Sequence, residues 1–391
     1  MPRDAGEPRV AFVASGLGLG GAEAMLLKIV PRLAAAGFGV AVVSLRDLGP
    51  VGRRLRDLRI DVQACGLPGL SALPSTARAA GWLRAFRPDV LQGWMYHGNL
   101  GALAAARATP SRPAVAFGIR QSLPSIDDEQ PGTRIAIRAG ARCSRRAAAI
   151  VYNARLSLAQ HEAAGYAHGA GLVIANGFDT ATFRPDAQVA RATRADLQVA
   201  ADAPLVGLVA RWHPVKDHRT FVDAAARIAR AMPAARFVMA GTGIDSGNEA
   251  LATLLARSGI ADRVRLVGER RDVDRLYPAL DVACLASRAE AFPNVLGEAL
   301  SCGVPCVSTA VGDAAEIIGE CGRIVPPGDA DALAAAVLQV LAMPAHERDA
   351  MGTAARERVV AQFGIDAVVR QYADLYRSLR RSRPPVPSRS P

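Results

Sequence analysis

Two pairs of charged residues in the second half of the chain suit chemistry on a phosphorylated ligand. Arg211 and Lys216 stand five residues apart after an apolar run. A guanidinium can fork onto two phosphate oxygens, and an ammonium supplies a point charge. Glu290 and Glu298 stand eight residues apart, and a carboxylate accepts hydrogen bonds from a vicinal diol such as that of ribose or a sugar ring. These residues predict a site for a diphosphate and a diol-bearing ring, with solvated surface charges as the alternative.

Backbone groups near these charges could add to an anion site. Pro293 is suited to the first turn of a helix. The amides of Asn294, Val295 and Leu296 would then lie at the start of that helix, where they could hold an anion. Near the N-terminus, a glycine loop at 16–21 follows an apolar run and precedes a helical pattern. Such a loop lets a phosphate approach the backbone closely.

The glycine loop also allows two other interpretations. Gly16, Gly18 and Gly21 satisfy the spacing of a dinucleotide-binding fingerprint, which expects a carboxylate about 20 residues further on. Here Arg46 precedes Asp47 at the end of the next apolar run, so NAD fits poorly and NADP only somewhat better. A tight turn between a strand and a helix is the remaining interpretation.

Apolar runs alternate with helical periodicity along the chain. This alternation predicts α/β domains with parallel sheets covered on both faces, and the pattern weakens in a polar stretch near residue 185. We therefore expect an N-terminal Rossmann-like domain at 1–185, a C-terminal one at 186–365, a helix at 366–380 that packs back on the first domain, and a disordered basic tail at 381–391. Ligands bind at the carboxyl ends of the strands in such folds, and two such sheets facing each other form a cleft.

Composition excludes several classes of protein. The chain has 391 residues, 50% hydrophobic and 21% charged, which is enough for full-sized cores and too apolar for a disordered protein. No apolar run reaches the length of about 18 residues that a membrane span needs. The N-terminal segment lacks the apolar core of a signal peptide, so we expect a cytoplasmic protein. The six cysteines include no CxxC pair and are expected to be small buried side chains.

The charge of the chain favours anionic partners. The net charge is +11, which suits phosphates, nucleic acid or an acidic membrane face. Aromatic residues make up only 5%, which disfavours a nucleic-acid-binding protein because such proteins use aromatic platforms. Several arginines recur at helical steps and predict a basic helix face: Arg134, Arg138, Arg142, Arg145 and Arg146. Such a face either docks on an anionic membrane or is an ordinary solvated surface.

Several ordered motifs together resemble one known family. Its glycine loop matches 18–23, its interdomain signature matches Asn176-Gly177-Phe178-Asp179 with Phe183-Arg184-Pro185, its basic pair matches Arg211 and Lys216, and its Glu-x7-Glu matches Glu290 and Glu298. Through nearly its whole length the chain thus resembles the retaining GT-B glycosyltransferases of the large family 4, also called glycosyl transferases group 1. It departs from the common pattern at Gly297, where a larger aliphatic residue is usual.

The resemblance assigns expected roles to the donor side. Arg211 and Lys216 would bind the diphosphate of a nucleotide sugar, Glu298 the ribose hydroxyls and Glu290 the sugar ring. The amides of Asn294, Val295 and Leu296, with Gly20 and Gly21, would complete the phosphate cradle. The segment from Gly268 to Arg270 matches the region that meets the base. Arg211, Lys216, Glu290 and His97 are the residues that we expect to carry catalysis.

The acceptor side is predicted from segments that follow strands. His97 matches a family histidine that touches the donor sugar or the acceptor, although a packing histidine is the alternative. Asn99 lies in the same segment, and Arg120 follows another strand and would meet an anionic acceptor. Asp272-Val-Asp274 has the spacing of a metal-binding DxD, but it falls at the start of a short helix, so we expect no metal and no other cofactor.

The resemblance implies retaining transfer of a hexosyl group from a nucleotide sugar to a glycan or lipid-linked acceptor in cell-surface polysaccharide assembly. Two other enzymes remain open. A nucleotide-sugar epimerase of the same architecture would use the same donor site. An NADP-dependent oxidoreductase would rest on the glycine loop alone and leave Glu290 and Glu298 unexplained.

Overall fold

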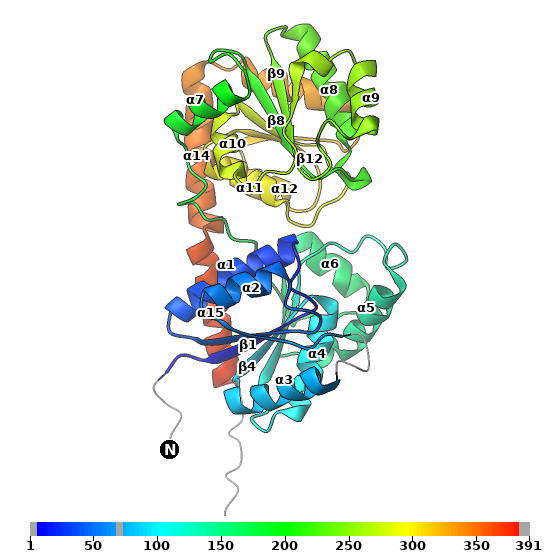
Figure 1. Cartoon of the computed structure of the whole chain (residues 1–391), viewed down its shortest axis with the longest axis vertical. Coiled ribbons are helices and arrows are strands. Elements are labelled where there is room, and N and C mark those ends of the chain that lie inside the picture. Colours follow the sequence, from blue (N-terminus) through cyan, green and yellow to red (C-terminus); the bar gives the residue numbers. More distant parts are fainter. Residues whose placement is uncertain (1–5, 68–72, 383–391) are drawn as a thin grey trace, which may run out of the picture. The chain divides into compact units, whose positions relative to one another are not determined.

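The chain forms two compact units (Figure 1). The computed structural model describes residues 6–67 and 73–382, without the side chains of 73–76. Unit 1 comprises Met1–Gly177 and Ile365–Pro391, and unit 2 comprises Phe178–Gly364. The polypeptide therefore enters unit 2 after Gly177, whereas the expected domain boundary was at 185/186, and it returns to unit 1 after Gly364.

Unit 1 contains a seven-stranded parallel sheet of order β3-β2-β1-β4-β5-β6-β7. Its strands are β1 (Arg9–Ala14), β2 (Gly39–Ser44), β3 (Asp61–Ala64), β4 (Val90–Trp94), β5 (Ala114–Ile119), β6 (Ala149–Tyr152) and β7 (Gly171–Val173). Its helices are α1 (Gly21–Ala35), α2 (Gly49–Asp57), α3 (Leu73–Phe86), α4 (Met95–Ala108), α5 (Pro131–Cys143), η2 (Ser144–Arg146), α6 (Arg155–Ala163) and α15 (Ile365–Arg381).

Alternate residues of the unit 1 strands face two separate cores. On one face, Phe12 and its neighbours pack against apolar residues of α1, α2 and α15. On the other face, Val13 and its neighbours pack against α3, α4 and α5. Figure 1 shows the two sets of helices on opposite sides of the sheet. Burial on both faces explains why these strands are continuous apolar runs rather than alternating patterns.

Unit 2 contains a six-stranded parallel sheet of order β10-β9-β8-β11-β12-β13. Its strands are β8 (Leu205–Val209), β9 (Arg236–Ala240), β10 (Val264–Leu266), β11 (Val282–Leu285), β12 (Cys306–Thr309) and β13 (Gly322–Val325). Its helices are α7 (Ala187–Asp196), η3 (Pro214–Lys216), α8 (His218–Ala231), α9 (Glu249–Arg257), η4 (Ala261–Arg263), α10 (Val273–Leu276), η5 (Tyr277–Ala279), α11 (Asn294–Ser301), α12 (Ala314–Ile318), α13 (Ala330–Leu341) and α14 (Ala345–Phe363).

This order is that of a doubly wound nucleotide-binding fold, 3-2-1-4-5-6, in which the direction of connection reverses between the first and fourth strands. Apolar residues of α8, α9 and α13 cover one face of the unit 2 sheet. Figure 1 shows α10, α11, α12 and α14 on the other side. The predicted fold class, two doubly wound Rossmann-like domains, is confirmed.

α7 and α14 are among the helices that local apolar patterns do not predict. α7 falls inside the polar stretch in which the domain boundary was expected, and Asp186 caps it by accepting from the backbone N–H groups of Gln188 at 3.0 Å and Val189 at 2.9 Å. Only Thr193 of this helix is buried, so apolar periodicity could not reveal it. α14 was also not predicted. The expected helix at 366–380 is present as α15, and most of the expected basic tail, residues 383–391, lies outside the described residues.

Candidate functional site

The carboxyl ends of β8 and β11 lie side by side at the centre of the unit 2 sheet. The two strands pair in parallel, with Val282 opposite Val206. The sheet order reverses direction between them, and such a switch point leaves a crevice in which ligands bind. The segments that follow these two strands carry all four predicted charged residues: Arg211 and Lys216 after β8, and Glu290 and Glu298 after β11.

Lys216 and Glu290 form an ion pair between the two loops. Nζ of Lys216 donates to Oε1 of Glu290 at 2.5 Å, and Oγ of Ser287 donates to the same oxygen at 2.7 Å. Only 21% of the Lys216 side chain and 15% of the Glu290 side chain are exposed. The structure thus places a predicted phosphate-binding cation directly beside a predicted sugar-binding carboxylate.

Asp217 and Arg288 form a second bridge between the loops, which the sequence analysis missed. Asp217 adopts the left-handed conformation (φ 46°, ψ 55°) and caps α8 by accepting from N–H of Thr220 at 3.3 Å. Its Oδ2 also accepts from Nε of Arg288 at 2.8 Å, and N–H of Arg288 donates to the Val215 carbonyl at 2.8 Å. These contacts fix the turn that carries Lys216. An Asp before a helix is a visible cap signal, but no local pattern identifies a partner 71 residues away.

Arg211 extends from the same loop into solvent. It is exposed, and within the described part of the chain its side chain has no hydrogen bond or ion pair. The two predicted phosphate-binding cations therefore differ. Lys216 is held in a fixed position by Glu290, whereas Arg211 is open to an incoming anion.

The start of α11 matches the prediction only in part. Pro293 is the residue before the helix (φ −74°, ψ 99°) rather than part of its first turn, and the helix begins at Asn294. N–H of Leu296 donates to the Pro293 carbonyl at 3.2 Å. The Leu296 amide is therefore already engaged, and the predicted phosphate cradle of Asn294, Val295 and Leu296 loses one of its three donors.

Glu298 lies in the second turn of α11 and is anchored by a buried tyrosine. Oη of Tyr277 donates to Oε2 of Glu298 at 3.1 Å. Burial and the neighbouring Glu298 carboxylate raise the pKa of Tyr277 well above its usual value, so the phenol stays protonated and remains a donor. One oxygen of Glu298 is thereby fixed.

The predicted base region follows β10 and is tied to the loop after β9. Gly268 has φ +66°; its N–H donates to the Ile244 carbonyl at 2.8 Å, and its carbonyl accepts from N–H of Gly241 at 2.7 Å. Arg270 forks onto Asp272 through Nε at 3.0 Å and a terminal nitrogen at 2.7 Å. This contact lowers the pKa of Asp272. The Arg270 charge is therefore paired within its own loop.

The glycine loop of unit 1 has a carboxylate beside Gly20, one of the residues predicted to hold a phosphate. Gly20 precedes α1, and Gly21 begins it. A β-carbon on Gly20 would collide with Oε2 of Glu23, so the folded-back glutamate is one reason for glycine here. Burial raises the pKa of Glu23. A phosphate on Gly20 and Gly21 would face this carboxyl group.

The three predicted acceptor-side residues have different environments in unit 1. His97 is exposed in the first turn of α4, and partial burial together with Arg46 lowers its pKa. Asn99 is only 1% exposed. Its Oδ1 accepts from N–H of Gly118 at 2.9 Å, and its Nδ2 donates to the Gly118 carbonyl at 3.3 Å. Asn99 therefore joins α4 to β5 and is not presented to an acceptor.

Arg120 is buried with 7% exposure, in contrast to its predicted contact with an anionic acceptor. Its guanidinium donates to Oη of Tyr372 at 2.7 Å and to Oδ1 of Asn176, and it lies 4.8 Å from the Trp94 ring centroid. Arg120 thus holds α15 and the end of the first unit 1 segment together. The structure does not place it where an acceptor could reach it.

Two family models match most of the chain. Residues 19–182 match Glycosyltransferase Family 4, and residues 203–343 match Glycosyl transferases group 1. The chain belongs to this glycosyltransferase family. The predicted enzyme class is confirmed at the level of the family, and neither model describes the oxidoreductase that the glycine loop left open.

Curated relatives of this family member have several different activities. It is 33% identical over 170 residues to N-acetyl-alpha-D-glucosaminyl L-malate synthase of Bacillus anthracis, covering 43% of this chain and 44% of the relative. It is 31% identical over 198 residues to the lipopolysaccharide core biosynthesis glycosyltransferase LpsE of Rhizobium meliloti, covering 50% and 56%. The chain spans about half the length of the curated relatives it matches.

Solved glycosyltransferases share the fold of this family member. The Anabaena protein HepE in complex with UDP superposes with a TM-score of 0.83 at 22% identity, covering 95% of this chain and 100% of that one. WaaG, a glycosyltransferase involved in lipopolysaccharide biosynthesis, superposes with a TM-score of 0.70 at 16% identity, covering 94% and 99%. These likenesses confirm the GT-B fold class.

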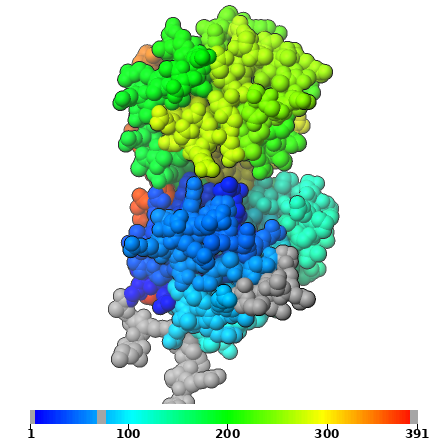
Figure 2. All heavy atoms as spheres, viewed as in Figure 1, coloured from blue at the N-terminus to red at the C-terminus, as the bar shows by residue number. Residues whose placement is uncertain are grey.

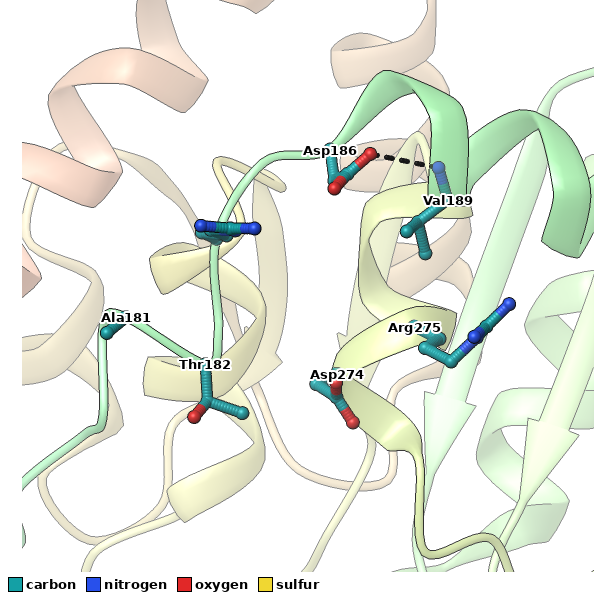
Figure 3. Close-up of a pocket in the computed structure, with 7 residues that line it drawn as sticks. Ala181, Thr182, Asp186, Val189, Asp274 and Arg275 are labelled. Carbon is teal, nitrogen blue, oxygen red and sulfur yellow. Dashed lines mark hydrogen bonds between the residues drawn. The ribbon is translucent and has the colours of Figure 1, made fainter.

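The DxD sequence of this family member borders a pocket of mixed charge. Asp274 and Thr182 point into a space of about 370 Å³, which Asp186, Arg184 and Arg275 also line (Figure 3). Asp272 is instead occupied by Arg270. The described residues contain no group of three or more histidine, cysteine or acidic side chains that could hold a metal ion. All six cysteines are free, and all but Cys143 are buried.

The predicted basic face is present on α5 and η2. Arg138, Arg142, Arg145 and Arg146 are exposed, as is the apolar Ile135 at 69%. Figure 2 shows this teal segment at the molecular surface. Three of these arginines line a shallow pocket of about 470 Å³: Arg138, Arg142 and Arg145. Within the described ranges, no helix is both long and apolar enough to cross a membrane.

Proposed function

We propose that this family member transfers a hexosyl group, with retention, from a nucleoside diphosphate sugar to a glycan or lipid-linked acceptor. The observation that carries the proposal is the Lys216–Glu290 ion pair. It places a cation suited to phosphate beside a carboxylate suited to sugar hydroxyls, at the switch point of a nucleotide-binding sheet. The UDP-bound and UDP-glucose-bound neighbours of the same fold support a donor of this class.

The proposed donor lies along the carboxyl edge of the unit 2 sheet. Arg211 and Lys216 bind the diphosphate, and Glu290 accepts from the sugar hydroxyls next to it. Glu298, held by Tyr277, accepts from the ribose hydroxyls. The segment from Gly268 to Arg270 meets the base. For His97 in unit 1 we propose a contact with the donor sugar or the acceptor; partial burial and Arg46 lower the pKa of its imidazole.

In the proposed reaction, the bond between the anomeric carbon and the diphosphate oxygen breaks, and the acceptor oxygen bonds to that carbon from the same face. The acceptor proton passes to the departing diphosphate. Negative charge develops on the diphosphate, so cations in contact with it lower the barrier. Arg211 and Lys216 supply two positive charges there, and we propose on this ground that the reaction needs neither a metal ion nor another cofactor.

The proposed setting is the cytoplasmic face of a membrane, in cell-surface polysaccharide assembly. The exposed arginines of α5 would attract anionic lipid head groups, each contributing about 1 kcal/mol near the surface, and Ile135 would enter the interface. This setting would bring a lipid-linked acceptor to unit 1. Cosedimentation tests it: binding to anionic but not zwitterionic vesicles should fall when Arg138, Arg142 and Arg145 are replaced by Glu, and unchanged binding would contradict it.

A thermal-shift panel tests the donor class. UDP, GDP, ADP, their sugar conjugates and NADPH are each added to the wild type and to Lys216→Ala. Binding to the native state alone raises the melting temperature, so one nucleoside diphosphate should stabilise the wild type and not the variant. Arg219→Ala is the matched control, because Arg219 is an exposed cation on neighbouring α8. A shift with NADPH alone would contradict the proposal.

Product analysis separates transfer from the epimerase alternative. The stabilising sugar conjugate is incubated with and without a glycan acceptor, and the sugar products are identified. Transfer predicts a glycosylated acceptor with the same anomeric configuration as the donor. Conversion of the donor to an epimer without an acceptor would favour the alternative.

A further inference from the structure

Trp212 differs from the other two tryptophans of the chain. The sequence contains three, and Trp82 and Trp94 lie in unit 1, where their indole N–H groups donate to Oδ2 of Asp61 at 2.7 Å and to the Ala22 carbonyl at 2.9 Å. Trp212 lies in unit 2 and is 37% exposed. Its indole N–H has no partner within the described residues. An exposed tryptophan with an open N–H, located between two predicted phosphate-binding residues, calls for an explanation.

The indole is held in place from one side. N–H of Trp212 donates to the Thr242 carbonyl at 2.8 Å. The indole ring lies 4.8 Å from the imidazole of His218, with 41° between their planes. Cβ of Trp212 also lies close to Gly243, where a β-carbon would approach it to 3.0 Å. The ring therefore has a fixed backing while part of it faces solvent, which is the arrangement of a stacking surface.

His218 provides that backing and is itself constrained. It is 3% exposed, and a ring N–H donates to the Ala210 carbonyl at the end of β8, while Nε2 has no partner in the described part of the chain. Burial is the largest cause that lowers the pKa of this imidazole; Lys216 also lowers it, whereas the Ala210 hydrogen bond and Asp217 oppose the shift. A neutral imidazole packs against the indole without introducing an uncompensated charge.

The position of Trp212 along the sheet indicates which part of a ligand it would meet. Trp212 is bonded to the loop after β9, and Oγ1 of Thr242 in that loop donates to Glu269 in the loop after β10 at 3.0 Å. Lys216, four residues further on, is bonded to the loop after β11. A ligand whose diphosphate lies on Lys216 would thus reach Trp212 on the β9 and β10 side, away from the Glu290 carboxylate.

We infer that the indole of Trp212 is the stacking platform for the nucleobase of the donor. The inference rests on the proposed function, because it assumes that a nucleoside diphosphate occupies this edge of unit 2. A base presents a flat face to an aromatic ring, and such stacking is sequence-tolerant because every base has one. The loop from Gly268 to Arg270 would then contact the edge of the base and choose among bases, while Trp212 sets the affinity.

Direct binding measurements test this role. The nucleoside diphosphate that most stabilises the wild type is titrated by calorimetry into the wild type, Trp212→Phe and Trp212→Ala, with Trp82→Phe as the matched control. Loss of a stacked aromatic weakens binding of a base roughly tenfold. Trp212→Ala should therefore raise Kd about tenfold, Trp212→Phe should raise it less, and binding of inorganic diphosphate should be unchanged in all variants. Ligand-free melting temperatures verify that each variant is folded.

Tryptophan fluorescence gives a second readout that folding defects do not imitate. Wild-type emission should change on adding the nucleoside diphosphate, and Trp212→Phe should remove that change, whereas Trp82→Phe should keep it. In turnover, Trp212→Ala should raise the donor KM and leave kcat within about twofold, because base stacking is uniform binding.

Three other outcomes would contradict the stacking role of Trp212, and each can be distinguished from the others. If the nucleoside diphosphate binds with the same Kd to the wild type and to Trp212→Ala, stacking is wrong while the proposed function stands. If emission changes only with the sugar conjugate and not with the nucleoside diphosphate, the indole meets the sugar instead. If no nucleoside diphosphate binds the wild type, both the inference and the proposed function fail.

Discussion

The ring of Phe178 fills the space that a β-carbon on Gly297 would need. Phe178 also stacks on Phe292 with ring centroids 6.0 Å apart and planes 19° apart. Gly297 belongs to α11, the helix that carries Glu298. The family pattern expects a larger aliphatic residue at Gly297, and the structure explains the departure: the aromatic ring of Phe178 provides the volume that a side chain at 297 would otherwise fill.

The first prediction concerns this exchange of volume. Gly297→Ala should destabilise the protein by about 1–3 kcal/mol, because overpacking forces the ring or the helix to move. In a Phe178→Leu background the same substitution should cost less, since the smaller side chain leaves room. Chemical denaturation of the four proteins gives the coupling free energy. An equal cost in both backgrounds would show that the two positions do not compete for space.

The second prediction concerns the ion pair at the proposed donor site. Lys216→Ala should lower kcat by about 100–1000-fold, the usual effect of removing one fixed donor to a developing anion. Glu290→Gln should lower it less, because Ser287 can still donate to the amide oxygen that replaces Oε1. Steady-state kinetics with the donor identified by thermal shift measures both. Arg219→Ala should behave as wild type, and full activity of Lys216→Ala would exclude a catalytic role for the lysine.

The third prediction separates a packing role for Arg120 from an acceptor-binding role. Arg120→Met should lower the free energy of unfolding by about 2 kcal/mol or more, because Tyr372 and Asn176 lose a charged hydrogen-bond donor. Limited proteolysis should then cut α15 more readily than in the wild type. The exposed Arg142→Met serves as the control. An unchanged stability combined with a raised acceptor KM would instead support the original acceptor assignment.

The fourth prediction concerns acid stability. His161 is fully buried, with Nδ1 near the Ser157 carbonyl at 2.7 Å and Nε2 near Oη of Tyr96 at 2.8 Å. Burial lowers the pKa of His161 to about 4 from 6.5. Between these pH values the unfolded chain binds a proton that the native protein does not. His161 therefore does not lower the free energy of unfolding above pH 6.5. As the pH falls from 6.5 toward 4, proton uptake by the unfolded chain lowers the free energy of unfolding by about 3 kcal/mol.

Urea denaturation at pH 7, 5.5 and 4.5 measures this loss. His161→Gln should be less stable than the wild type at pH 7 and should lose less stability on acidification. His346→Gln is the control, because His346 is exposed on α14 and its replacement alters no buried group. Parallel profiles for the wild type and His161→Gln would assign the acid sensitivity to other groups.

Apolar periodicity in the local sequence indicates some of the helices and strands and misses others. α13 belongs to the first group, because its buried leucines and valines recur at helical spacing: Leu333, Val337, Val340 and Leu341. α14 has only a narrow buried stripe that includes Val359 and Phe363, and no pattern of this kind revealed it. Helices that are stabilised by a polar N-cap or by a few tertiary contacts cannot be predicted from local apolar periodicity alone.

The residues of the candidate site also fall into those that the sequence predicts and those whose environment it does not predict. Lys216 and Glu290 could be found because residues after parallel strands gather at one edge of the sheet. Arg120 also follows a strand, but its partners Asn176 and Tyr372 are 56 and 252 residues away. The local sequence therefore does not predict that Arg120 is buried. Strand-end position predicts where a residue lies along the sheet and does not predict whether a distant segment covers it.

The place of α15 has a consequence for synthesis on the ribosome. The core on one face of the unit 1 sheet includes Val368, Tyr372 and Tyr376 from this helix, which is translated after the whole of unit 2. The residues of unit 2 emerge as one uninterrupted segment, so unit 2 can complete its core while unit 1 still exposes an uncovered apolar sheet face. The first-made half of the chain is therefore the last to finish folding, and nascent chains stalled before α15 should be recognised by chaperones that bind apolar surfaces.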